Sequence, residues 1–126
     1  MLRLAAAAAL SCCLLAGSAS AADCKFQIGK GDYIGNVTKS INASKTCKAA
    51  KATADACAMG SSGDIQIAGA AYTKCEKEVK LTAAQKTALD KAKAACTKKY
   101  SRQQGTMYLS MNAFCHLEAL TKYAKK

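Results

Sequence analysis

The sequence predicts an all-α protein: a four-helix antiparallel bundle with a short irregular N-terminal arm, stapled by three disulfides. Three observations support this fold class. The chain contains no proline and is rich in alanine and lysine, which favour helices. Its apolar residues recur at spacings of three and four, the period of a helix. Its cysteines fall mostly on those apolar faces, as expected for cross-links between helices.

The first 22 residues have the pattern of a secretory signal peptide, so we exclude them from the fold. Arg3 precedes an apolar run of 13 residues, and an Ala-Ser-Ala cleavage site follows at 19–21. The run is too short to span a bilayer. A lipoprotein anchored at Cys12 or Cys13 is the alternative, but neither cysteine has the Leu-x-x-Cys approach with a small residue before the thiol. We expect a secreted or periplasmic protein with a single domain over residues 23–126.

The predicted elements follow one another with short connections. An irregular arm over 23–36 carries three glycines, and helices are expected over 37–58, 64–79, 83–100 and 106–123. A Gly-Ser-Ser-Gly stretch ends the first helix. Thr82 and Gln85 have the spacing of a capping box, which starts the third helix.

Each predicted helix has one apolar face. The faces are Cys47, Ala50, Ala54 and Cys57; then Ile65, Ala68, Tyr72, Cys75 and Val79; then Ala84, Ala88, Ala92, Ala95 and Cys96; and finally Leu109, Ala113, Leu117, Leu120 and Ala124, widened by Met107, Met111 and Phe114. Many of these side chains are alanines, so the core is lean, and each disulfide is expected to add ~2–4 kcal/mol of stability.

The helical hairpins predict which cysteines pair. Residues that face each other in an antiparallel hairpin lie at equal distances from the loop, which matches Cys47 with Cys75 and Cys96 with Cys115. Cys47 and Cys57 lie about 15 Å apart along one helix and cannot bond each other. Cys24 and Cys57 remain, and their bond would attach the arm to the end of the first helix.

The net charge indicates an anionic partner or a solvated lysine surface. The formal net charge is +11, and it stays near +10 when Arg3 is removed with the signal peptide. Lysines concentrate on the second and third helices, and the candidate basic patch is Lys74, Lys77, Lys86 and Lys93. Such a patch attracts an anionic envelope component, or it only keeps an alanine-rich protein in solution. Nucleic acid is not an expected partner, because the protein is exported and no row of aromatic residues is present for base stacking.

The sequence argues against an enzyme and predicts no cofactor and no metal site. His116 is the only histidine, and a Cys–His pair with Cys115 would need a free thiolate. There is no Cys-x-x-Cys pair and no glycine-rich phosphate loop. Asn36 and Asn42 stand in Asn-x-Ser/Thr triplets, which matter only if the source glycosylates its proteins.

An ordered series of short motifs resembles a known family. Residues 53–121 contain Cys57-Ala58, Asp64 followed by Tyr72, Leu81-Thr82 followed by Gln85, then Cys96, Cys115 and Thr121. This order and spacing resemble the LprI-type lysozyme-inhibitor family, which consists of small exported helical proteins of bacteria. The chain differs from the family pattern at Ala68 and Gly69, where the family has Leu-Asn, and in the additional Cys24 and Cys75.

The resemblance implies a non-catalytic protein that occludes the cleft of a lysozyme-like glycoside hydrolase. Many lysozymes are basic, so two positive proteins repel each other over a Debye length of about 8 Å. Inhibition therefore needs an acidic or apolar element, or a lysine that faces the carboxylates of the cleft. We expect this element to be the exposed loop of Met59, Gly60, Ser61, Ser62, Gly63 and Asp64.

Overall fold

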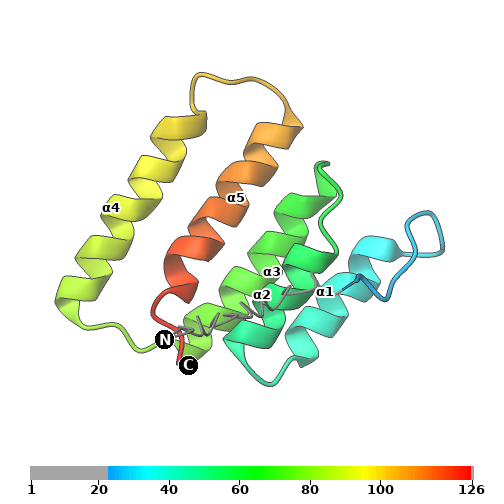
Figure 1. Ribbon diagram of the computed structural model, residues 1–126, viewed down its shortest axis with the longest axis horizontal. Coiled ribbons are helices and arrows are strands. Elements are labelled where there is room, and N and C mark those ends of the chain that lie inside the picture. Colours follow the sequence, from blue (N-terminus) through cyan, green and yellow to red (C-terminus); the bar gives the residue numbers. More distant parts are fainter. Residues whose placement is uncertain (1–22, 126) are drawn as a thin grey trace, which may run out of the picture.

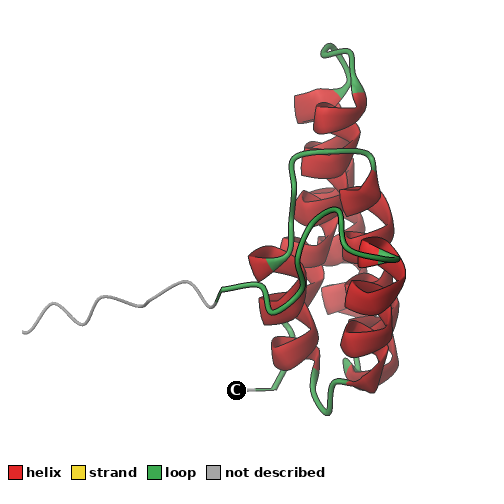
Figure 2. Cartoon of the chain, turned by 90° about the vertical axis from the view of Figure 1, so that its right-hand side faces the viewer, coloured by secondary structure: helices red, strands yellow, loops and turns green. Residues whose placement is uncertain are grey.

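The computed structural model describes residues 23–125, and the predicted signal peptide lies outside this range. The regular elements of the described residues are all helices (Figure 2). They are α1 (Tyr33–Ala43), α2 (Cys47–Ala56), α3 (Gly63–Glu78), α4 (Ala83–Tyr100) and α5 (Thr106–Thr121). The predicted fold class, all-α, is confirmed, whereas the predicted number of four helices is wrong.

The helix predicted over 37–58 is two helices, because the chain is extended between them. Ser44 and Thr46 both have extended backbone angles, and the Thr46 hydroxyl accepts a hydrogen bond from the Ala49 N–H, which makes it the N-cap of α2. The irregular arm is also shorter than predicted. Asp32 caps the start of α1 by accepting from the Gly35 N–H at 2.9 Å, so the helix begins at residue 33.

The helices form an open row rather than a closed bundle (Figure 1). α3 lies at the centre, with α1 and α2 packed on one side and α5 on the other. The backbone of α4 packs against α5 and adjoins no other helix. The predicted four-helix bundle would have enclosed this helix against the first hairpin, and the structure does not show that arrangement.

All three predicted disulfides are present. Cys47–Cys75 joins α2 to α3, and Cys96–Cys115 joins α4 to α5. Cys24–Cys57 attaches the N-terminal arm to the end of α2. The α2–α3 junction has a second link, because the Cys47 N–H donates to the Glu78 carboxylate at 2.6 Å.

The core uses small residues where three helices meet. Ala50 and Ala54 of α2 and Ala71 of α3 are fully buried, which allows the backbones of these helices to approach closely. The largest buried apolar side chains are Val37, Ile41, Ile67, Leu117 and Leu120. The predicted face Cys47, Ala50, Ala54 and Cys57 is buried throughout, as expected.

The predicted inner face of α4 is confirmed at Cys96 and wrong at three of its five positions. Ala84, Ala88 and Ala95 are exposed, and the buried residues of this helix are Leu89 and Cys96. Leu89 is the only leucine of α4. Its burial in the core determines which face of the helix points inward. The capping box predicted from Thr82 and Gln85 is present at the start of α4.

Candidate binding surface

The loop predicted to bind a partner is held by a buried carboxylate. Asp64, the second residue of α3, is 1% exposed. Its Oδ1 accepts from the Met59 N–H at 2.8 Å, and its Oδ2 accepts from the Gly60 N–H at 2.7 Å and the Ser61 N–H at 3.3 Å. The Ser110 hydroxyl of α5 also donates to Oδ2, at 3.1 Å. One side chain therefore fixes three successive backbone amides and joins the loop to α5.

The segment before the loop is anchored as well. The Tyr33 hydroxyl donates to the Cys57 carbonyl at 2.8 Å, and Cys57 is bonded to Cys24. Burial, and then the charge of Asp64, raise the pKa of the Tyr33 hydroxyl, so it stays a protonated donor at neutral pH. Gly60 has a φ of +71°, in the left-handed region that favours glycine. Anchors on both sides give the loop one defined shape.

Asp64 departs from the expectation that the whole loop is exposed. Its side chain is buried, so it has no access to the cleft of an enzyme. Gly60 and Ser62 are exposed, and Met59, Ser61 and Gly63 are partly exposed. The exposed part of the loop therefore consists of backbone and uncharged side chains. The buried Asp64 carboxylate holds the loop in shape through its hydrogen bonds to the backbone.

Several apolar side chains are exposed on the first turns of α3 and α5, at the same end of the molecule as this loop. They are Ile65 at 37%, Met107 at 48%, Leu109 at 58% and Met111 at 42%. The predicted inner faces of α3 and α5 are wrong at these positions. Ser110 is the residue that faces Asp64, and each helical step turns by about 100°, so Leu109 and Met111 point to either side of α3. Met111 lines a different hollow, with Asp55 and Tyr100, so we call residues 59–63 with Ile65, Met107 and Leu109 the loop-end surface.

A shallow groove continues from this surface between α3, α4 and α5. It has a volume of about 300 Å³ and is lined by Ile65, Ala68, Gly69, Tyr72, Thr73, Lys93, Ala113 and His116. The Lys93 ammonium lies 5.2 Å from the centre of the Tyr72 ring and bridges the groove. Ala113, predicted to face inward, lies only half-buried in its floor.

His116 is tied to α4 and has no thiol partner. Its Nε2–H donates to the Lys93 carbonyl at 3.1 Å, and the same nitrogen lies 3.2 Å from the Thr97 hydroxyl. Burial lowers the pKa of His116, and the Lys93 charge lowers it further against the opposing effect of the carbonyl. Cys115 is bonded to Cys96, so the Cys–His pair that we considered from the sequence is not formed.

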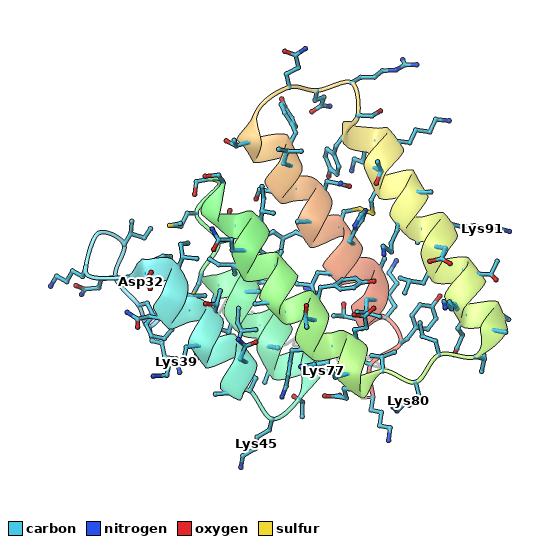
Figure 3. All side chains as sticks on the ribbon, turned by 180° about the vertical axis from the view of Figure 1, so that it is seen from behind. Asp32, Lys39, Lys45, Lys77, Lys80 and Lys91 are labelled. Atoms are coloured by element: carbon cyan, nitrogen blue, oxygen red, sulfur yellow. A yellow bond between two sulfur atoms is a disulfide. The ribbon has the colours of Figure 1, made fainter. Side chains whose placement is uncertain are left out.

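The four lysines of the candidate basic patch do not form one cluster. Lys74 and Lys77 lie on α3, whereas Lys86 and Lys93 lie on α4, and the backbones of these two helices are not neighbours. Lysines gather instead at the end of the molecule opposite the loop. Lys45, Lys77 and Lys80 point outward there (Figure 3). Six lysines lie in the last turn of α3, at the start of α2, or just after α1, α3 or α5. We call them the basic end: Lys45, Lys48, Lys77, Lys80, Lys122 and Lys125.

Within residues 23–125, no helix is long and apolar enough to cross a membrane. In the same range, no three His, Cys, Asp or Glu side chains are grouped so that they could hold a metal ion. Comparison of the chain with models of protein families, with curated proteins and with solved structures gives no match in any of the three.

Proposed function

We propose that the protein is an exported, non-catalytic binding protein that inhibits a lysozyme-like glycoside hydrolase by occupying its cleft with the loop-end surface. The observation that carries this proposal is the fixed loop, with three amides held by Asp64, beside exposed apolar side chains. The order of motifs that resembles the LprI-type family supports the choice of target.

A fixed loop favours binding because little conformational entropy remains to be lost. Ordering one flexible side chain on binding costs about 0.5–1.5 kcal/mol, and a loop already held in place avoids much of this cost. Exposed methionine and leucine side chains provide apolar area that a partner can cover. In this arrangement Asp64 holds the shape of the loop although its own side chain does not reach the partner.

The distribution of charge is compatible with a basic target. Residues 56–63 carry no charge, and the basic end lies at the other end of α3. The 16 residues of α3 span about 24 Å, which is roughly three Debye lengths at physiological salt. Lys98, Lys99 and Arg102 lie closer to the loop-end surface, at the end of α4, where a cleft carboxylate would attract them.

The disulfides support export. Three such bonds form and persist in oxidising compartments such as the periplasm or the extracellular space, and they are rare in the cytosol. The predicted signal peptide points to the same location.

The test is inhibition of lysozyme by the oxidised protein, residues 23–126, at physiological salt. Replacing the exposed Ser62 by tryptophan should obstruct the loop and weaken inhibition by at least about 10-fold, a loss typical of a contact at the centre of an interface. Ala88→Trp is the matched control, because Ala88 is exposed on α4 away from the loop. Absence of inhibition by the wild-type protein, or equal losses in both variants, would refute the proposal.

A further inference from the structure

A hollow lined by lysines lies between α2 and the segment that follows α5. Lys48 and Lys51 of α2 line one side, and Lys122 and Lys125 line the other, with Glu118 and Ala124 completing the wall. Its volume is about 330 Å³. Two segments that are distant in the sequence thus bring four positive charges around one concave space.

One of these lysines is held in place by acids. Lys51 Nζ lies 2.6 Å from the Asp55 carboxylate and 3.0 Å from Glu118, and its side chain is 25% exposed. Burial lowers the pKa of Lys51, but the hydrogen bonds with Asp55 and Glu118 outweigh this effect and raise it. Lys51 therefore remains charged and fixes one wall of the hollow.

The other three lysines have no such partner. Among residues 23–125, Lys51 makes the only ion pairs, so Lys48, Lys122 and Lys125 are not paired with a carboxylate of these residues. Lys45, which precedes α2, lies at the same end of the molecule, as do Lys77 and Lys80 (Figure 3). Glu118 is paired with Lys51, so positive charge dominates the remaining lining, and a concave surface of this kind attracts an anion.

We infer that this hollow binds a phosphate ester, with the phosphate between Lys48, Lys122 and Lys125. Three separate ammonium groups suit a compact group with several anionic oxygens, and lysine binds phosphate as a point charge. The volume is at the lower end of the range of small-molecule sites and exceeds what one phosphate fills. Ala124 and the lysine methylenes provide an apolar wall for the glycerol, sugar or acyl part of the ligand.

The ligand is either a soluble phosphate ester or an anionic lipid headgroup, and two probes distinguish these sources. Glycerol 3-phosphate is titrated into the oxidised protein, residues 23–126, and followed by amide chemical shifts at physiological salt. Co-sedimentation with phosphatidylglycerol vesicles is compared with that of phosphatidylcholine vesicles. Saturable shifts at residues 48, 51, 122 and 125 with the first probe indicate the soluble source, and binding only to the anionic vesicles indicates the lipid.

A matched pair of triple variants separates a site from diffuse charge. The hollow variant is Lys48→Gln, Lys122→Gln and Lys125→Gln, and the control is Lys86→Gln, Lys91→Gln and Lys98→Gln, which removes the same charge from exposed positions of α4. A lysine near an anionic partner contributes roughly fivefold in affinity, so the hollow variant should lose on the order of 100-fold. The control should lose less than about fivefold.

Equal losses in the two variants, or no binding of either probe by the wild-type protein, would overturn the inference. All six substitutions are at exposed lysines, so both variants should keep the circular dichroism and melting temperature of the wild type. The inference is independent of the proposed inhibition, because neither probe involves a lysozyme.

Discussion

Replacing Asp64 by asparagine tests the role of the buried carboxylate in holding the loop. The substitution keeps the shape of the side chain and removes its charge and one acceptor oxygen. If the amide oxygen takes the place of Oδ2, it still accepts from Gly60, Ser61 and Ser110. The amide nitrogen then faces the Met59 N–H, so two donors meet and neither has a partner.

The expected loss follows from these contacts. A hydrogen bond to a charged group contributes about 1.5–3 kcal/mol, and a buried donor left without a partner costs about 1–3 kcal/mol. Because the two contributions overlap, we expect a decrease of about 2–4 kcal/mol in the free energy of unfolding, a large part of a typical 5–15 kcal/mol. The melting temperature should fall by roughly 10–20 °C.

Urea unfolding with the disulfides intact measures this loss, and hydrogen exchange of the residue 59 and 60 amides reports on the loop itself. Asp90→Asn is the control, because Asp90 is exposed on α4 and the substitution changes the net charge equally. The control should stay within about 0.5 kcal/mol of the wild type. If Asp64→Asn costs less than about 1 kcal/mol and leaves the exchange of these amides unchanged, the carboxylate does not hold the loop.

Three further predictions concern the cross-links, the histidine and the capping box. Replacing both Cys47 and Cys75 by alanine opens a loop with a sequence separation of 28 and should cost about 3–4 kcal/mol in urea unfolding; a cost below about 1 kcal/mol would show that the helices hold this junction without the bond. The lowered pKa of His116 means that the unfolded chain binds a proton more readily than the folded protein, so stability should fall as the pH drops below about 6.5. His116→Gln should flatten this pH dependence, and an unchanged slope in that variant would contradict the assignment. Thr82→Ala removes a cap of α4 and should cost about 1 kcal/mol in thermal unfolding, whereas no measurable change would mean that the end of the helix is already frayed.

The disulfides and three of the helices could be predicted because both follow from local rules. Antiparallel hairpins fix which cysteines face each other, and the predicted pairs are those observed. The capping box of Thr82 and Gln85 predicted the start of α4, and the predicted range 83–100 matches the helix. The break between α1 and α2 also had a local signal, the N-cap residue Thr46.

The faces of α4 and α5 could not be predicted, because burial depends on the neighbours of a helix as well as on its own pattern. An alanine-rich helix such as α4 has no dominant apolar stripe, and its backbone packs along one helix rather than two. Leu109 continues the apolar stripe of α5 in the sequence, but no neighbouring element of the described residues covers it, and its side chain is exposed. The position of Asp64 depends on Ser110, 46 residues away, and no local pattern reports such a contact.

The placement of the disulfides divides the described chain into two parts that the backbone joins and no disulfide links. Within residues 23–125, two of the bonds lie before residue 80 and the third lies after residue 82. A protease cut at 80–82 would therefore yield two fragments that separate on a non-reducing denaturing gel, yet in water they would remain associated through α3 and α5. The protein should accordingly be reconstituted from two independently oxidised peptides, with the seam between α3 and α5 as the recognition surface.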